Sequence, residues 1–220
     1  MRTAVLIPAR YDSSRLPGKM LLELNGNPLV RHVFDICEQS GYDTYVLTDN
    51  DLVAEAVPRF IKTGPAENGT ERCCYAMNDL AYDRFINVQG DMPDITVDII
   101  KSVADMLDNY SVSTAYTHMP ENKLNDPNTV KLIQTNGLAH WFGRMSVKYG
   151  YHHLGVYGYR REMKNIYLTA TQHQEERTEK LEQLRWIQNG YKIGCAFVNF
   201  DGLEINTAED LREWHKKNSQ

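Results

Sequence analysis

The chain has 220 residues, of which 42% are hydrophobic and 24% are charged. This is the composition of an ordinary globular protein with enough chain to bury a sizeable core. The formal net charge of −5 argues against a general nucleic-acid binder, whose basic surface would dominate the balance. No apolar run approaches the roughly 18 residues that a membrane span needs, and the N-terminus lacks a signal-peptide layout, so we expect a cytoplasmic protein without a membrane span.

Apolar, β-rich runs alternate with helical patterns through the first half of the chain. The elements expected there are, in chain order, a strand at Thr3–Ile7, a helix at Leu29–Ser40 with Gly41 as its C-cap, a strand at Thr44–Leu47, a short helix at Asp51–Val57, a helix at Thr70–Leu80, a strand at Arg84–Val88 and a helix at Thr96–Leu107. This order predicts an α/β fold in which helices cover both faces of a mostly parallel sheet.

The middle of the chain changes character, because short strand candidates follow one another with only turn residues between them. They are Val112–His118, Thr129–Gln134, Leu138–Phe142 and Leu154–Tyr159. A helix at Glu176–Gln188, a strand at Ile193–Val198 and a helix at Thr207–Lys216 are expected after them. No Pro/Gly/Ser-rich linker divides the chain, so we expect one domain over residues 1–220 with a small mixed or antiparallel lobe inserted at about residues 112–160.

The cysteines and histidines have no metal-binding spacing. The four cysteines contain no C-x-x-C pair and are Cys37, Cys73, Cys74 and Cys195. Free, buried thiols in a reducing compartment are the expected state. Among the seven histidines only His152 and His153 lie together, and no H-E-x-x-H motif is present.

The segment from Ile7 to Lys19 reads IPARYDSSRLPGK and follows the first expected strand. Its two prolines exclude a helix interior, so it is a loop, and it carries Arg10, Arg15 and Lys19. Open α/β sheets bind ligands with loops at the carboxyl ends of their strands. Three cations there indicate an anionic ligand with several phosphate charges. The alternative is a solvated basic loop.

The motif NVQGDMP ends the third expected strand. A carboxylate at that place, Asp91, is well positioned to hold Mg²⁺ between itself and substrate phosphates. Gln89 can donate and accept hydrogen bonds, which suits a nucleobase edge or a sugar hydroxyl. The alternative is a plain turn that caps the following helix.

The motif NGTER opens the helix expected at Thr70–Leu80. Thr70 is the candidate N-cap, and a helix start preceded by glycine can accept an anion or a base carbonyl. Arg72 would add positive charge. The alternative is a capped surface helix.

Seven motifs occur in the same order as in the 3-deoxy-manno-octulosonate (KDO) cytidylyltransferases. They are IPARYDSSRLPGK, NGTER, NVQGDMP, NDPNTVKL, HLGVYGYR, EKLEQLR and INTAEDL. The chain resembles this family from about Ala4 to Trp214, and seven motifs in order are specific although each alone is weak. The related sialic-acid cytidylyltransferases have a similar first strand but a loop of the Gly-Gly-Ser-Lys type.

The resemblance implies a Rossmann-like nucleotidyltransferase core and a reaction in which CTP and KDO give CMP-KDO and pyrophosphate. The anomeric hydroxyl of the sugar attacks the α-phosphorus, so no protein nucleophile is needed. Mg²⁺ is the implied cofactor, and CTP and an acidic keto sugar are the implied substrates. The family is typically homodimeric through the inserted lobe.

The resemblance also assigns site residues. The catalytic ones are Arg10, Lys19 and Asp91. The nucleotide-binding ones are Arg10, Ser13, Arg15, Lys19, Asn68, Gly69, Thr70, Arg72 and Gln89. The sugar-binding ones are Gln89, Arg144, His153, Tyr157, Glu182 and Gln183, and the metal ligands are Asp91 and Asn206. Without the resemblance, His153 would be taken for a packing residue, and Glu182 for an ordinary helix-surface charge.

Three departures from the family pattern lie at the sugar or metal end. The late loop of relatives reads V-D-T-P-E-D, whereas this chain has Asn206 in place of the metal-binding aspartate. A neutral oxygen predicts weaker metal affinity, unless Glu204 or the substrate compensates. Met92 replaces an acidic residue, and the stretch between Arg144 and His152 is short. We therefore consider an amino-substituted octulosonate or another 2-keto-3-deoxy acid as an acceptor.

Two other functions stay open at this point. One is a nucleotidyltransferase for a different acceptor, such as a nonulosonate or a sugar 1-phosphate. The other is a non-catalytic paralogue that binds nucleotide or a partner protein, for which Asn206 is the only support in the sequence.

Overall fold

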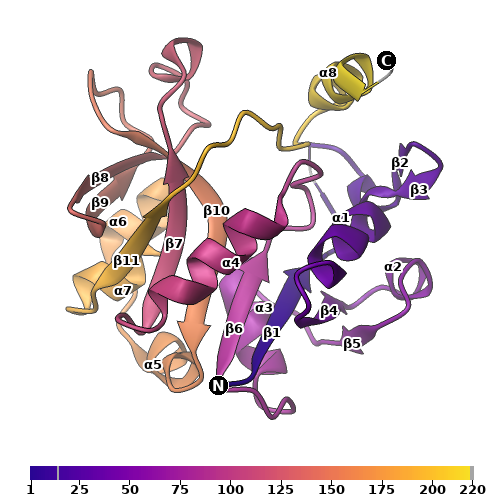
Figure 1. The fold of residues 1–220 in the computed structure, drawn as a ribbon, viewed down its shortest axis with the longest axis horizontal. Coiled ribbons are helices and arrows are strands. Elements are labelled where there is room, and N and C mark those ends of the chain that lie inside the picture. The colour runs from indigo at the N-terminus through magenta and orange to yellow at the C-terminus, as the bar shows by residue number, and fades with distance from the viewer. Residues whose placement is uncertain (14, 219–220) are drawn as a thin grey trace.

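The computed structural model describes residues 1–13 and 15–218, and one nine-stranded sheet forms its centre (Figure 1). Its strands are β1 (Thr3–Pro8), β4 (Asp43–Thr48), β5 (Phe60–Lys62), β6 (Arg84–Val88), β7 (Val112–Thr117), β8 (Lys131–Thr135), β9 (Leu138–Gly143), β10 (Tyr151–Arg160) and β11 (Ile193–Phe197). They lie in the order β5-β4-β1-β6-β10-β7-β11-β9-β8. The strands from β5 to β6 are parallel, β10 is antiparallel to both of its neighbours, and β8 and β9 form an antiparallel edge.

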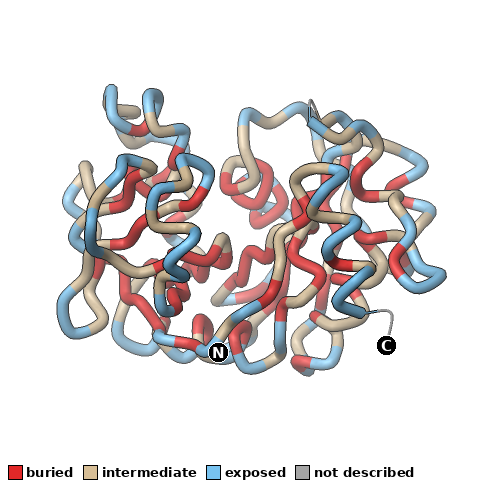
Figure 2. Tube along the Cα trace, turned by 90° about the horizontal axis from the view of Figure 1, so that it is seen from above, coloured by how far each residue is buried: buried red, intermediate tan, exposed pale blue. Residues whose placement is uncertain are grey.

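Helices cover both faces of this sheet. They are α1 (Leu29–Glu38), α2 (Asp51–Glu55), α3 (Gly69–Ala76), α4 (Val97–Met106), α5 (Met163–Thr169), α6 (Gln174–Glu179), α7 (Leu184–Gln188) and α8 (Ala208–Asn218). The remaining elements are two 3-10 turns, η1 (Lys19–Leu21) and η2 (Glu121–Lys123), and a small hairpin of β2 (Glu23–Leu24) and β3 (Asn27–Pro28). Successive residues of β1 enter different clusters, because side chains alternate across a strand. Val5 and Ile7 pack with α1 and α4, whereas Ala4 and Leu6 pack with α3 and α7. Figure 2 shows the buried residues in the interior of the trace and the exposed residues mostly around its rim.

The α/β fold with its mostly parallel first half is confirmed. The first helix ends at Glu38, and its C-cap is Gln39 rather than Gly41, which instead makes the following turn at φ 80°. Strand β5 and helix α5 were not expected from the sequence. Within residues 112–160, β7 and β10 belong to the main sheet, and the β8–β9 hairpin lies at its edge. The division into a core and an inserted lobe stays a prediction.

The continuous helix expected at Glu176–Gln188 is wrong. Helix α6 ends at Glu179, Lys180 takes a left-handed conformation at φ 54°, and α7 begins at Leu184. The apolar spacing fits an unbroken helix, but tertiary contacts of the residues between α6 and α7 determine the backbone there. Their side chains bond to α3 and β10, as described below.

All four cysteines are buried and free, as expected. Burial raises the pKa of each thiol, to about 12 for Cys74 and Cys195, so these thiols stay protonated and unreactive at neutral pH. Among the described residues, no helix has the length and apolar character needed to cross a membrane.

The chain between β11 and α8 crosses the carboxyl end of the sheet (Figure 1). Ile205 N–H donates to the carbonyl of Asp91 at 2.9 Å. The carboxylate of Asp94 accepts the Leu203 N–H at 2.9 Å and the Trp214 Nε1–H at 2.8 Å. Trp214, the buried residue of α8, packs edge-on against the ring of His32. Asp94 therefore ties both the crossing segment and α8 to the loop after β6.

Asp94→Ala should lower the free energy of unfolding by about 2–4 kcal/mol, because it removes two charge-assisted hydrogen bonds and leaves a buried indole N–H unsatisfied. Urea unfolding followed by tryptophan fluorescence measures this loss. Asp98→Ala is the matched control, since Asp98 is an exposed carboxylate in the first turn of α4 and should cost less than about 1 kcal/mol. Equal losses in the two variants would contradict the anchoring role of Asp94.

Candidate active site

The candidate site begins where β1 and β6 end. These strands are adjacent and parallel, with Leu6 paired to Asn87, so the loops that follow them emerge at the same edge of the sheet. Gly18 takes a left-handed conformation at φ 66° and starts the turn η1. The turn directs Lys19 to the other loop, where its Nζ lies 2.6 Å from Asp91 Oδ2.

A third segment adds Asn206 to this ion pair. Its Oδ1 accepts a hydrogen bond from Arg15 Nη2 at 3.0 Å and lies 3.5 Å from Lys19 Nζ. The loop after β1, the loop after β6 and the crossing segment thus converge on four polar side chains. We call this group the basic cluster; it consists of Arg15, Lys19, Asp91 and Asn206. Its two cations and one carboxylate give it a net positive charge, which suits a polyanion.

Oxygen donors at the cluster fit a hard cation. The Asp91 carboxylate and the Asn206 carbonyl oxygen are ligands of the type that Mg²⁺ takes. Glu204 lies two residues before Asn206, and its removal from water, followed by the Asp91 charge, raises its pKa to about 7. Among the described residues no group of three acidic, histidine or cysteine side chains forms a complete metal cage. A Mg²⁺ ion here would need substrate phosphates and water as further ligands, which is its usual mode of binding.

Arg10 and Ser13 lie on the same loop as Lys19. Arg10 is exposed just beyond β1, and the Ser13 hydroxyl accepts the Leu16 N–H at 3.4 Å. Arg72 differs from these residues because it is buried on α3, where its Nη2 donates to Asp49 at 2.9 Å and its Nη1 to Thr63. An internal ion pair therefore already holds the Arg72 charge.

Gln89 lies at the meeting point of β6, α3 and β10. Its Nε2 donates to the Oδ1 of the fully buried Asn87 at 3.1 Å. A Cβ on Gly69 would lie 3.3 Å from the Gln89 amide, and one on Gly155 would lie 3.4 Å from Gln89 Cγ. Glycine at position 69 therefore allows α3 to approach the Gln89 side chain closely. Asn87 opens the NVQGDMP motif but had no role among the expected site residues, although a polar residue inside an otherwise apolar strand was a signal for one.

Thr70 is not the N-cap of α3, contrary to the expectation. Asn68 takes that position, and its Oδ1 accepts the Glu71 N–H at 2.8 Å. The Thr70 hydroxyl instead bonds with the Tyr159 hydroxyl at 3.0 Å, and the Thr70 N–H donates to Glu182 at 2.9 Å. Two N–H groups of this helix start thus have partners within the chain.

Three of the predicted sugar residues, His153, Tyr157 and Gln183, form a buried polar group on β10 and the segment before α7. The Tyr157 hydroxyl donates to Gln183 Oε1 at 3.1 Å, and the rings of Tyr157 and His153 are 5.4 Å apart. His153 Nε2 bonds with the hydroxyl of Thr114 at 2.9 Å. The Gln183 side chain is buried, and its Nε2 has no hydrogen-bond partner within the part of the chain that the structure describes. A buried, unsatisfied amide group is what a polar ligand would complete.

Arg144 follows β9 at the rim of this group. Its Nη1 donates to the Asn128 carbonyl at 2.6 Å, and its backbone N–H donates to Glu179 at 2.8 Å. Its positive charge adds to the effect of burial in lowering the pKa of His153. The same charge opposes the increase that burial causes in the pKa of Glu204. Arg144 is therefore electrostatically coupled both to the buried polar group and to the crossing segment.

His153→Gln should make the free energy of unfolding fall less steeply as the pH is lowered from 7. Burial lowers the pKa of His153 from 6.5 to about 3, so the unfolded chain binds more protons between these values, and stability falls as the pH falls through that window. Between pH 7 and pH 5, this one group should lower the free energy of unfolding by about 2 kcal/mol. Urea unfolding at both pH values should therefore give a smaller decline for the variant than for the wild type. Equal declines would contradict a neutral, buried His153.

Sequence relatives identify the family. A family model described as cytidylyltransferase matches residues 4–193. The 3-deoxy-manno-octulosonate cytidylyltransferase 2 of Hydrogenovibrio crunogenus is 37% identical over 96% of this chain and 96% of its own length. The 8-amino-3,8-dideoxy-manno-octulosonate cytidylyltransferase of Shewanella baltica is 35% identical over 99% of this chain and 98% of its own length.

A solved structure agrees with these relatives. CMP:2-keto-3-deoxy-manno-octonic acid synthetase complexed with CTP matches with a TM-score of 0.93 at 31% sequence identity, over 100% of this chain and 99% of that chain. Sequence and fold thus agree over the whole length of the chain. The chain therefore belongs to the cytidylyltransferase family, and within it to the 3-deoxy-manno-octulosonate cytidylyltransferases that its motifs resemble.

Proposed function

We propose that this protein couples CTP to KDO, or to a close 3-deoxy-2-keto sugar acid such as 8-amino-3,8-dideoxy-manno-octulosonate, and releases pyrophosphate. The observation that carries the proposal is the basic cluster at the carboxyl ends of β1 and β6. It combines cations for a triphosphate with oxygen ligands for a metal ion, beside a buried group of neutral hydrogen-bonding side chains. The relatives named above support the substrates, since their names give KDO and its 8-amino derivative.

The cations of the first loop are proposed to bind the triphosphate of CTP. Lys19 and Arg15 already converge at the cluster, and Arg10 and Ser13 lie on the same loop. Their positive charge would stabilise the negative charge that builds up on the departing pyrophosphate. Because the attacking oxygen belongs to the sugar, the chain needs to orient the two substrates and not to form a covalent intermediate.

Mg²⁺ is the proposed cofactor, and Asp91 and Asn206 are its proposed ligands. A bound Mg²⁺ neutralises phosphate charge and lowers the barrier to displacement of pyrophosphate. Lys19 Nζ pairs with Asp91 Oδ2 at 2.6 Å, so the proposed metal ligand lies beside a cation proposed to bind phosphate. The carboxylate of Glu204 lies close enough for the Asp91 charge to affect it and could supply negative charge that Asn206 lacks.

The sugar acid is proposed to bind at Gln89, His153, Tyr157 and Gln183, with further contacts from Arg144 and Glu182. Burial holds His153 neutral and Tyr157 protonated, because it lowers the pKa of the first and raises that of the second. Both would therefore act as fixed hydrogen-bond partners of sugar hydroxyls and not as proton-transfer groups. The Gln183 amide is free to donate to such a hydroxyl.

We also propose a cytoplasmic homodimer. Four buried free thiols are typical of a protein in a reducing compartment. An apolar surface near the β8–β9 edge exposes Met145 by 47% and Tyr149 by 66%, and it borders a pocket of about 220 Å³ that also includes Ile133 and Trp141. Large exposed apolar side chains that cluster in this way are typical of protein–protein contacts.

Pyrophosphate release should require both CTP and the sugar acid in the presence of Mg²⁺. A coupled pyrophosphate assay with KDO, the 8-amino derivative and no acceptor, beside UTP, ATP and GTP, tests the proposal. Release with another nucleotide, or with a sugar 1-phosphate or a nonulosonate but neither octulosonate, would contradict it. CTP binding without release under any acceptor would favour the non-catalytic alternative that Asn206 raises.

Asn206→Asp should lower the Mg²⁺ concentration needed for half-maximal rate by about 3- to 10-fold, because a second carboxylate adds charge for a hard cation. Arg15 donates to position 206 and would pair with the new carboxylate, which limits the gain. Asn206→Ala is the control and should raise the Mg²⁺ requirement, since it removes the oxygen. An unchanged requirement in both variants would remove position 206 from the metal site.

A further inference from the structure

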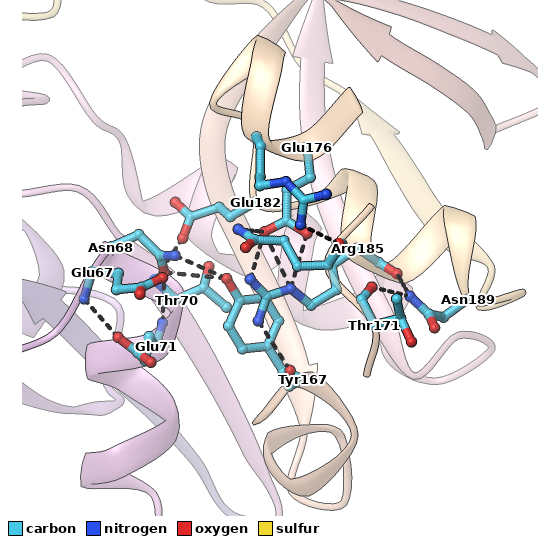
Figure 3. A network of polar contacts seen from close by, with 12 residues as sticks. Glu67, Asn68, Thr70, Glu71, Tyr167, Thr171, Glu176, Glu182, Arg185 and Asn189 are labelled. Atoms are coloured by element: carbon cyan, nitrogen blue, oxygen red, sulfur yellow. Dashed lines mark hydrogen bonds and ion pairs between the residues drawn. The ribbon is translucent and has the colours of Figure 1, made fainter. Parts of the chain in front are cut away.

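A hydrogen-bonded network links the start of α3 to the segment before α7 (Figure 3). On the α3 side, Asn68 Nδ2 donates to the Tyr167 hydroxyl at 3.0 Å, while its Oδ1 caps the helix by accepting the Glu71 N–H. The cap orients the Asn68 amide, and the Tyr167 hydroxyl both accepts from its Nδ2 and lies within 3.3 Å of its Oδ1, to which it can donate. Burial raises the pKa of Tyr167, so its hydroxyl keeps its proton.

Arg185 holds Tyr167 from the other side. Its guanidinium lies 4.1 Å from the centre of the Tyr167 ring and donates to the Tyr167 carbonyl at 3.2 Å. The same guanidinium binds the buried carboxylate of Glu176 with contacts of 2.6 and 2.9 Å. Buried, fork-shaped pairs of this kind are rigid, and breaking one leaves an uncompensated charge. Tyr167 is thus fixed by helices α6 and α7.

The same two helices carry the segment predicted to bind the sugar. Glu182 and Gln183 directly precede α7, and Arg185 lies within the first turn of that helix. Glu182 accepts the Thr70 N–H at 2.9 Å, two residues after Asn68. The start of α3 is therefore attached to the α6–α7 unit directly through the Glu182 carboxylate, and indirectly through Tyr167 of α5, which Arg185 holds.

We propose that Tyr167 is a positioning residue that holds Asn68 in the conformation that binds CTP and thereby sets the affinity of the nucleotide subsite for CTP. This proposal rests on the proposed function, in which Gln183 binds the sugar, and on the family resemblance, which assigns Asn68 to the nucleotide. The Tyr167 hydroxyl acts on the nucleotide only through Asn68. Its loss should therefore change the affinity for CTP more than the chemical step or the affinity for the sugar.

Tyr167→Phe removes the hydroxyl and keeps the ring against Arg185. The Kd and KM for CTP should rise about 3- to 10-fold, the effect of one lost hydrogen bond, while kcat and the KM for the sugar change by less than about twofold. The matched control is Tyr45→Phe, which removes a hydroxyl bonded to Tyr82 at 3.1 Å and should leave both KM values unchanged. A general loss of stability would affect the two variants alike, so a rise in KM for CTP confined to Tyr167→Phe marks positioning.

A double-mutant cycle with Asn68→Ala tests the route of the effect. If Tyr167 acts through Asn68, Tyr167→Phe should have no further effect on the Kd for CTP in the Asn68→Ala background. Additive losses, or a Tyr167→Phe variant indistinguishable from Tyr45→Phe, would overturn the inference. Calorimetric titration of the wild type with CTP and the pyrophosphate assay separate this failure from failure of the proposed function. If only the inference about Tyr167 fails, the wild type still binds CTP and releases pyrophosphate.

Discussion

The ion pair between Lys19 and Asp91 is the contact on which the candidate site depends. It forms because β1 and β6 are adjacent parallel strands, so that both following loops open at one edge of the sheet. Each charge is the other's partner before any ligand arrives. If Lys19 binds phosphate and Asp91 binds a cation, as proposed, both ligands would compete with this contact, and each would assist the binding of the other.

Two other parts of the chain are arranged around this pair. The crossing segment after β11 is fixed by hydrogen bonds to Asp91 and Asp94, and it brings Asn206 to the cluster. The break between α6 and α7 presents Glu182 and Gln183 to α3 and β10. Segments far apart in the sequence thus surround the loops after β1 and β6, and each is held by a few specific hydrogen bonds.

Local signals predicted much of the fold. Strands β1 and β6 were predictable, because mainly apolar runs that end at a Pro or Gly break leave few alternatives. The placement of the antiparallel β10 between β6 and β7 was not predictable, since strand pairing is non-local. The break at Lys180 escaped because Leu181 and Leu184 keep a helical spacing, whereas the contacts that stop the helix come from α3 and β10.

Local sequence likewise indicated some residues of the candidate site and not others. Proline, glycine and cation placement alone indicated the loop of Lys19, and the strand end indicated Asp91. The roles expected for Gln183 and Arg144 came from resemblance, because nothing in their local sequence distinguishes them from surface residues. Tyr167 was missed, since it lies on an unexpected helix and its proposed role depends on a contact with Asn68 across 99 positions of sequence.

The most direct test of the Lys19–Asp91 account is Mn²⁺ binding, measured by electron paramagnetic resonance with and without CTP. If Lys19 occupies Asp91 until phosphate binds, Mn²⁺ should bind tightly only when CTP is present. Equally tight Mn²⁺ binding without CTP would contradict it.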